Sequence, residues 1–299
     1  NTATPPESLV TSGPWRVRSY LENQQTVLAR NPYWLGVDAK GRRLPYLDEV
    51  VFRVAKDQDA VAQMFHAGEL DGLDRVKPED YKQFDAEQKS KGFTLHEVGP
   101  SFNTEFMWFN LNRVRKAEKG KKPGDPVIEP WKFAWFSNRD FRRAVSMAID
   151  RDAMIKGPYF GYGVKGWSLL TQGNPRWYDS TVTAPDYDPE QAKQLLDQLG
   201  LRDRNGDGIR EDAAGHAVSF TVITNSDNKL RQSMAALMQD DLQKVGIKIT
   251  PSGLDFNTLV TKTRSDYQYE ACQLGLGSGV PADPGMGANF WKSTGLTHY

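Results

Sequence analysis

The spacing of hydrophobic residues is most regular between residues 186 and 277. In "YDPEQAKQLLDQLG" four apolar residues have the i, i+3, i+4, i+7 spacing of one helical face, namely Ala192, Leu195, Leu196 and Leu199. Asp188 stands before Pro189, as an N-cap stands before the first helical position, and Gly200 follows the last apolar residue. The pattern predicts a helix that begins after Asp188 and ends before Gly200.

Strand-like runs rich in β-branched residues alternate with helical patterns after that helix. Strands are predicted at 218–225, 247–250 and 267–275, with helices at 229–246 and 255–266 between them. Strands that alternate with helices through short connections predict a parallel sheet with right-handed crossovers. Parallel sheets of this kind bind ligands beyond the carboxyl ends of their strands.

Three segments should therefore face a ligand: "TNSDN" (224–228), "PSGLDF" (251–256) and "GLGSGV" (275–280). Ordinary surface turns would explain the first two equally well. In the third, glycine would let a bound molecule approach the backbone closely. The candidate binding residues in it are Gly275, Leu276, Gly277, Ser278 and Gly279.

The remaining patterns predict a second α/β unit in the first hundred residues. Two β-like runs within 13–34 and another at 47–55 precede a short helix at 60–66 and a strand around Leu70. The segment 99–112 would be the crossover between domains, because periodicity and composition change on either side of it.

Beyond that crossover, "SNRDFRRAVSMAIDRDAMI" (137–155) predicts a helix with an apolar stripe, and Ser137 with Asp140 resembles a capping box.

Composition excludes several classes of protein. Among 299 residues, 38 Lys and Arg balance 38 Asp and Glu, so no net positive charge favours nucleic acid or an anionic membrane. No apolar run approaches the ~18 residues of a membrane span. Cys272 is the single cysteine, which excludes an internal disulfide and a cysteine-rich zinc site, and its apolar surroundings predict a buried, inert thiol.

No catalytic motif stands out. The chain has no G-x-S-x-G, H-E-x-x-H or P-loop sequence, and "GLGSG" lacks the spacing of a dinucleotide-binding loop. The four histidines are scattered, and no pair of acids is distinctive. The sequence therefore favours binding over catalysis, with a hydrolase that uses scattered acids on an α/β scaffold as the alternative.

The stretch "DRNGDGIRED" (203–212) partly matches a calcium-binding loop. The candidate ligands are Asp203, Asn205, Asp207, the Ile209 carbonyl and Glu211. Ala214 occupies the twelfth position, where a bidentate carboxylate normally completes the shell. A plain polar turn would use the same residue types. No cofactor is otherwise expected, and Ca²⁺ is the one candidate ion.

The order of several segments resembles the peptide/nickel-type (family 5) periplasmic substrate-binding proteins of ABC transporters. The matching segments are "SGPWRVRSY…TVLARNPYW", "LPYLDEVVFRV", "AGELDG", "FNLN" followed by "SNRDFRRAVSMAIDRDAMI", and "DRNGDGIRED". Each is weakly specific alone, but together they span almost the whole chain in the family's order.

The resemblance implies a two-lobed α/β fold of the type II periplasmic-binding-protein class, with parallel or mixed sheets flanked by helices. Residues 1–100 would form part of lobe I and 101–299 most of lobe II, with the chain re-entering lobe I near its C-terminus. It also implies that the chain is partial, with any signal or lipid-anchor sequence outside it, and that the protein works in the periplasm or outside the cytoplasm. The implied partners are a peptide-like or other polar oligomeric solute and an ABC permease, not nucleic acid. A ligand-sensing binding protein is a further alternative.

The resemblance implies ligand-facing positions as well. These are Asp74 and Arg75 in lobe I, the crossover residues Ser101, Phe102, Asn103 and Thr104, and the 275–280 segment. Peptide binders of the family carry a Gly-Trp pair and then an acid that pairs with the peptide's α-amino group. Here Leu276 replaces the Trp, and Gly279 or Val280 replaces the acid. The expected cargo is therefore a blocked peptide, an oligosaccharide or another polar molecule.

Overall fold

The computed structural model describes residues 4–117, 120–168, 170–277, 283–292 and 295. By contacts within the chain it divides into two compact units, Asn1–Asp74 and Arg75–Tyr299. Each unit is described by itself below. Segment 278–282, which includes the predicted Ser278, Gly279 and Val280, lies outside the described residues.

The first unit contains a small antiparallel sheet. After a short 3-10 turn (Pro6–Ser8), β1 (Trp15–Leu21), β2 (Gln25–Arg30) and β3 (Glu49–Arg53) pair in sequence order, and α1 (Gln58–His66) follows. The predicted strands and helix of this unit are confirmed, but the strand expected around Leu70 is not formed. Asp57 caps α1 by accepting a hydrogen bond from the Ala60 N–H at 2.8 Å.

The second unit is built on a four-stranded sheet in the order β4-β7-β5-β6. Its strands are β4 (Thr104–Phe109), β5 (Ser219–Asn225), β6 (Lys248–Leu254) and β7 (Ala271–Leu276). β5 is parallel to both β6 and β7, whereas β4 is antiparallel to β7. The predicted parallel arrangement of the last three strands is confirmed, and the sheet as a whole is mixed because the crossover segment supplies β4.

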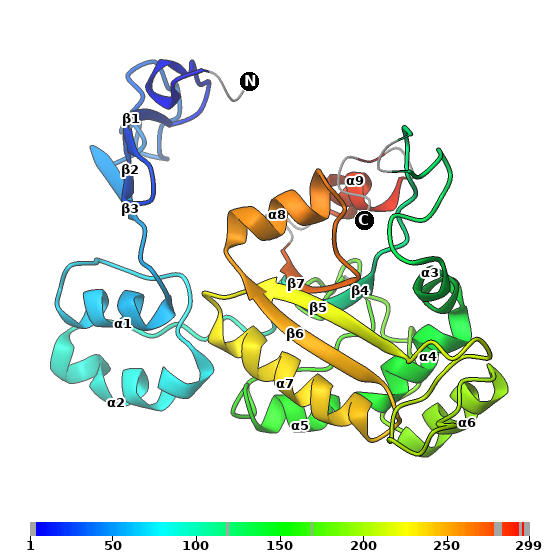
Figure 1. Cartoon of the computed structure of the whole chain (residues 1–299). Helices are drawn as coiled ribbons and strands as arrows, with labels where there is room; N and C mark the ends of the chain where they lie inside the picture. Colours follow the sequence, from blue (N-terminus) through cyan, green and yellow to red (C-terminus); the bar gives the residue numbers. More distant parts are fainter. Residues whose placement is uncertain (1–3, 118–119, 169, 278–282, 293–294, 296–299) are drawn as a thin grey trace. The chain divides into compact units, whose positions relative to one another are not determined.

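Helices cover both faces of this sheet (Figure 1). The unit begins with a 3-10 turn (Pro78–Asp80) and α2 (Tyr81–Lys91), and α7 (Lys229–Gln243) and α8 (Phe256–Arg264) connect the parallel strands. The other helices are α3 (Pro130–Ser137), α4 (Arg139–Ala148), α5 (Arg151–Lys156), α6 (Pro189–Gln198), a 3-10 turn (Pro284–Gly287) and α9 (Ala288–Trp291).

The larger part of the core lies between the sheet and the layer of α4, α6 and α7. Phe141, Ala144 and Val145 of α4 are almost fully buried there, as their helical spacing predicts, and Leu196 of α6 packs into the same cluster. Burial of each Phe or Leu side chain contributes about 1.5–3 kcal/mol. On the other face Leu259 of α8 packs in a smaller cluster with Cys272, which confirms that this thiol is buried.

Two sequence predictions about the helix at 137–155 are corrected. The segment forms α4 and α5 with a break at Ile149 and Asp150, and Asp150 caps α5 by accepting from the Ala153 N–H at 2.9 Å. Asn138 rather than Ser137 caps α4, with its side-chain oxygen 2.8 Å from the Asp140 nitrogen. Ser137 is the last residue of α3, a helix that the sequence analysis did not predict.

Candidate functional site

The strand ends of the second unit meet at one edge of the sheet. Because β5, β6 and β7 are parallel, their carboxyl ends at Asn225, Leu254 and Leu276 lie on the same edge. β4 runs the opposite way and begins there, with Thr104 paired to Leu276 and Glu105 paired to Gly275. The structure therefore brings the predicted crossover residues beside the predicted glycine segment.

A charged pair is placed at this edge. Glu105, from the start of β4, accepts two hydrogen bonds from Arg231 of α7, one from Nε and one from Nη2, each at 2.8 Å. The side chains are only 21% and 14% exposed, so the pair is shielded from water on most sides. The third nitrogen, Nη1, donates to Asn225 Oδ1 at 2.8 Å, which fixes the guanidinium against the end of β5.

Local sequence explains why Arg231 reaches Glu105. Asn228 caps α7 and accepts from the Arg231 N–H at 3.0 Å, so Arg231 sits in the first turn directly after the end of β5. Gly275 leaves the space that the pair occupies, since a Cβ at this position would lie 2.5 Å from Glu105 Oε1 and 2.6 Å from Arg231 Nη2. The protein's own ion pair therefore excludes a side chain at position 275, and the role of Gly275 in ligand binding stays a prediction.

Two other predicted residues are in contact. With its amide oriented to satisfy its neighbours, Asn103 accepts from Arg75 Nη1 at 2.9 Å and from Nη2 at 3.2 Å. A Cβ at Gly277 would overlap the Asn103 amide, so that glycine is also required by close packing.

The other predicted positions are placed as follows. Ser101 is exposed and its hydroxyl accepts from the Asn103 N–H at 3.0 Å, and Phe102 is half-buried. Asp74 is the last residue of the first unit and is exposed.

Tyr159 lies close to the same charges. Burial and the negative charge of Glu105 raise its pKa to about 12, against the opposing effect of Arg231 and Arg75. We refer to Arg75, Asn103, Glu105, Tyr159, Asn225 and Arg231 as the strand-end cluster. Glu105, Tyr159 and Arg231 were not among the site residues predicted from the sequence. Asn225 lies within the predicted 224–228 segment, and Arg231 lies in the first turn of α7, which begins directly after that segment.

Polar atoms without partners lie next to the cluster. The hydroxyls of Thr104 and Thr224 and the amide oxygen of Gln273 are buried, and none has a hydrogen-bond partner within the described part of the chain. Thr224 and Gln273 are two residues beyond Val222 and Ala271 of the larger core, so strand alternation places them on the same face, toward the strand ends. Buried polar groups usually have a partner, so this layer is suited to hold water or a polar ligand group.

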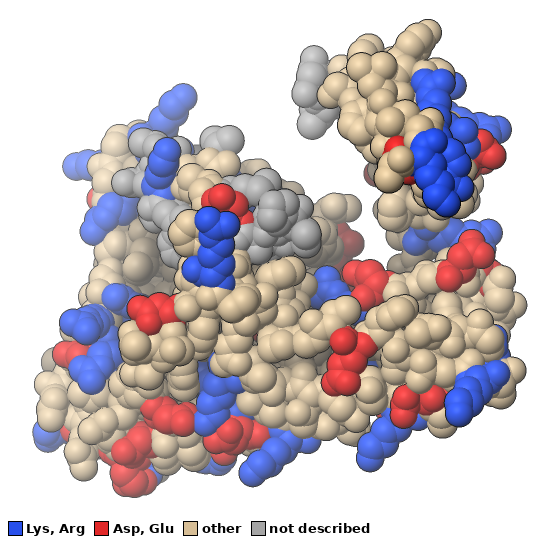
Figure 2. All heavy atoms as spheres, turned by 180° about the vertical axis from the view of Figure 1, so that it is seen from behind, with Lys and Arg blue, Asp and Glu red and all other residues tan. Residues whose placement is uncertain are grey.

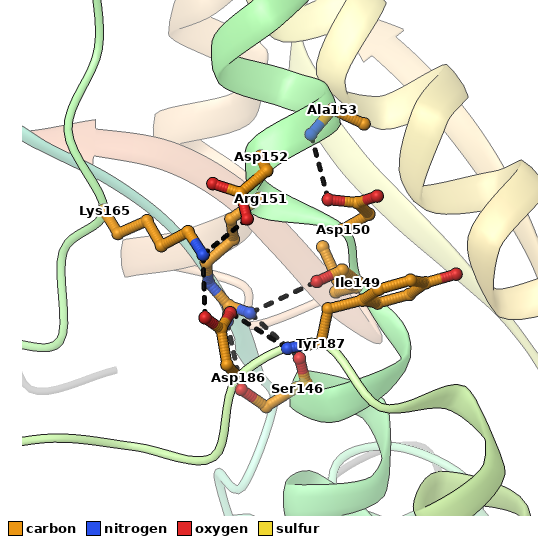
Figure 3. A network of polar contacts seen from close by, with 9 residues as sticks. All are labelled: Ser146, Ile149, Asp150, Arg151, Asp152, Ala153, Lys165, Asp186 and Tyr187. Carbon is orange, nitrogen blue, oxygen red and sulfur yellow. Dashed lines mark hydrogen bonds and ion pairs between the residues drawn. The ribbon is translucent and has the colours of Figure 1, made fainter.

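A second polar network supports the segment that carries Tyr159 (Figure 3). Lys165 Nζ lies 2.7 Å from carboxylate oxygens of both Asp152 and Asp186, which ties the chain after α5 to the helix itself. Arg151 donates to the Ser146 carbonyl at 2.9 Å and to its hydroxyl at 3.0 Å. The network joins α4, α5 and the loop that follows, and within it Lys165 is paired with two acids of the protein.

The pair formed by His216 and Asp212 lies at the other end of the strands from this edge. His216 Nδ1 lies 2.9 Å from Asp212 Oδ2, and its ring stacks on Trp131 with centroids 4.2 Å apart. Asp212 and His216 precede β5 in the chain, so they lie at the amino end of that strand. On the face shown in Figure 2, basic and acidic side chains are interspersed over the second unit, without one large patch of a single sign.

The calcium candidates come together in part. One carboxylate oxygen each from Asp203, Asp207 and Glu211 lie within 4.8 Å of one another. Asn205 Nδ2 donates to Asp207 Oδ2 at 3.2 Å, so Asn205 is on the same loop surface.

Open α/β sheets bind ligands beyond the carboxyl ends of their strands, where this unit places its polar cluster. The chain belongs to the bacterial extracellular solute-binding proteins, family 5, whose middle region matches residues 1–298. None of the helices in the described residues is long and apolar enough to cross a membrane.

Named relatives agree with this assignment. A protein of Deinococcus radiodurans described as a "Probable ABC transporter-binding protein" is 31% identical over 304 residues, covering 98% of this chain and 49% of the relative. The periplasmic alpha-galactoside-binding protein of Rhizobium meliloti is 31% identical over 261 residues, covering 83% of this chain and 36% of the relative. The chain therefore spans at most about half the length of these relatives, which are binding proteins.

A solved structure shows the same fold. The oligopeptide-binding protein AppA of Bacillus subtilis, in complex with a nonapeptide, matches with a TM-score of 0.65 and 25% identity. The match covers 89% of this chain and 47% of that one. The predicted family and the α/β binding-protein fold are thus confirmed.

Proposed function

We propose that the whole protein is the extracytoplasmic substrate-binding component of an ABC importer. It captures a polar oligomeric solute, a peptide or an oligosaccharide, and delivers it to a membrane permease. Family membership supports the transport role. One relative is named as an alpha-galactoside-binding protein, and the structure of another was solved in complex with a nonapeptide. In this chain the proposal rests on one observation, the strand-end cluster at the edge where such sheets bind ligands.

The cluster favours a ligand held by hydrogen bonds and not by a strong central charge. Both carboxylate oxygens of Glu105 are engaged by Arg231, so Glu105 is neutralised within the protein. Asp227, two residues after β5, is an exposed acid beside the cluster, and it accepts from the Asn225 side-chain amide. A peptide with a free α-amino group would pair with Asp227, whereas a sugar would not need that charge.

Mass spectrometry of solute released from the full-length protein, purified from its native host, identifies the cargo class. Titration calorimetry then compares Asp227→Asn with Asp266→Asn, which removes an exposed acid before β7. For a peptide with a free amino terminus we expect at least a ~10-fold loss of affinity in Asp227→Asn and no change in the control. For an oligosaccharide both variants should bind like the parent. Absence of any bound or binding solute, or turnover of the solute, would contradict the proposal.

The proposal includes location in the periplasm or at the cell surface. Partition of the native protein between aqueous and detergent phases distinguishes a free periplasmic form from a lipid-anchored one.

A further inference from the structure

The loop between α6 and β5 is held as a tight hairpin. Glu211 forms antiparallel bridges with Arg202 on one side and with Ala217 on the other. Gly206 and Gly208 both have positive φ, 81° and 84°, which lets the chain reverse within residues 203–211. The hairpin brings residues at the first, fifth and ninth positions of the loop to one point.

The three carboxylates are spaced to hold one ion. Their oxygens lie within 4.8 Å of one another, and Ca²⁺–oxygen distances of about 2.4 Å place oxygens on opposite sides of the ion about 4.8 Å apart. Asp203 accepts from the Gly206 and Gly208 N–H groups at 2.7 and 2.9 Å, so the backbone fixes its orientation.

A second observation is the environment of Glu211. This side chain is only 6% exposed, and its Oε2 accepts from the Arg204 N–H at 2.9 Å. Its Oε1 is buried without a hydrogen-bond partner in the described structure. A buried carboxylate oxygen without a partner is costly, and an ion held between Glu211, Asp203 and Asp207 would supply the missing interaction.

The guanidinium groups of Arg204 and Arg210, the two arginines within the loop, donate to other acceptors. Arg204 donates from its side chain to the carbonyls of Gly200, Glu211 and Asp212, and Arg210 donates to Asp197 and to the Val245 carbonyl.

Three further cations, Lys193, Arg202 and Lys244, line the same open hollow of about 590 Å³ as Asp203. Lys193 pairs with Glu190 and Lys244 with Asp241, so Arg202 is the one of these three that would compete with calcium for the carboxylates.

We propose that Asp203, Asp207 and the buried Glu211, with the Asn205 side chain and the Ile209 carbonyl, form a calcium site that clamps the α6–β5 hairpin. The donors are all oxygen, which suits Ca²⁺ better than Zn²⁺, and Glu211 at the ninth position takes the place of the carboxylate missing at Ala214. The site lies apart from the strand-end cluster, since the hairpin leads into the amino end of β5. Its function is structural and independent of the cargo.

The test is calorimetric titration of CaCl₂ into the full-length protein after treatment with EGTA, with MgCl₂ in parallel. We expect one calcium per chain, a rise in Tm on binding, and much weaker binding of Mg²⁺. Glu211→Gln should weaken calcium binding at least ~10-fold. Asp212→Asn removes the neighbouring charge, which contacts His216 instead, and should retain affinity within about threefold.

Asp203→Asn, at an exposed position, gives a second test if Glu211→Gln fails to fold, and the same loss is expected. Circular dichroism checks that each variant keeps its fold. The proposal is overturned by no binding at ~10 mM calcium, well above the range of weak extracellular sites. It is also overturned if a folded Glu211→Gln or Asp203→Asn variant binds calcium as tightly as the parent.

Discussion

Glu105 and Arg231, 126 residues apart in the sequence, form a two-bond ion pair over Gly275 at the edge of the sheet. The pair joins β4 to the first turn of α7, the helix that connects the parallel strands β5 and β6. It therefore fixes the antiparallel edge strand to the parallel part of the sheet at the same edge as the proposed ligand-binding cluster.

Removal of one partner of the Glu105–Arg231 ion pair should lower the free energy of unfolding. Glu105→Gln leaves the largely buried Arg231 guanidinium without its charge partner, and we expect a loss of about 2–4 kcal/mol in the free energy of unfolding. Arg231→Met should cost a similar amount, and the double variant should recover part of it. Urea unfolding of all four proteins measures the coupling.

The control cycle uses the exposed pair Glu190–Lys193 on α6, for which we expect coupling of at most ~0.5 kcal/mol. Equal coupling in the two cycles would show that burial of the Glu105–Arg231 pair has no special effect.

The part of the fold that the sequence predicts is the part in which neighbours in the chain are neighbours in space. β5, α7, β6, α8 and β7 follow one another through short connections, so local periodicity gives their type and their parallel order. β4 was not predicted because "TEFMWF" has no alternation and pairs with β7, more than 150 residues away. The partner of Glu105 could not be predicted for the same reason.

The N-cap of α4 lies one residue after the position that the sequence predicts. Ser137 and Asn138 are both good N-caps, and only the structure shows that Asn138 accepts from the Asp140 N–H. Asn138→Ala should therefore lower stability by about 1 kcal/mol, whereas Ser137→Ala, the matched control, should change it by less than ~0.5 kcal/mol. Thermal unfolding of both variants decides between the two caps. A larger loss of stability in Ser137→Ala than in Asn138→Ala would show that Ser137 is the N-cap, as the sequence predicts.

The glycine segment shows a different limit. Sequence reasoning located 275–277 at the strand ends, which the sheet confirms, but it expected the glycines to make room for a bound molecule. The neighbours of Gly275 and Gly277 are side chains of the protein, from Glu105, Arg231 and Asn103. A glycine in the sequence indicates that another group approaches the backbone closely. Which group this is depends on contacts between residues that are far apart in the sequence.

Tyr159 should make stability fall at high pH. Its pKa is about 12 in the folded protein against 10.0 for the free side chain, so folding is favoured below pH 10 and that stability is lost as pH rises toward 12. At ~1.4 kcal/mol per pKa unit the loss is about 2–3 kcal/mol. Urea unfolding at pH 9–12 should show this loss in the parent and a smaller one in Tyr159→Phe. Tyr20→Phe, which removes an exposed hydroxyl, should behave like the parent.

Asn103 should affect ligand affinity more than stability. It is half-buried, accepts two hydrogen bonds from Arg75 and lies beside Gly277, so Asn103→Ala removes a group that orients Arg75 without opening the core. With the solute identified from the full-length protein, we expect about a 10-fold rise in Kd, equal to ~1.4 kcal/mol. The Tm should fall by only a few degrees, since the substitution removes no part of the hydrophobic core. Gln83→Ala, at an exposed position of α2, serves as the control and should leave both values unchanged. An Asn103→Ala protein with the parent's affinity would show that Arg75 and Asn103 pair for structural reasons and that the ligand lies elsewhere on the strand edge.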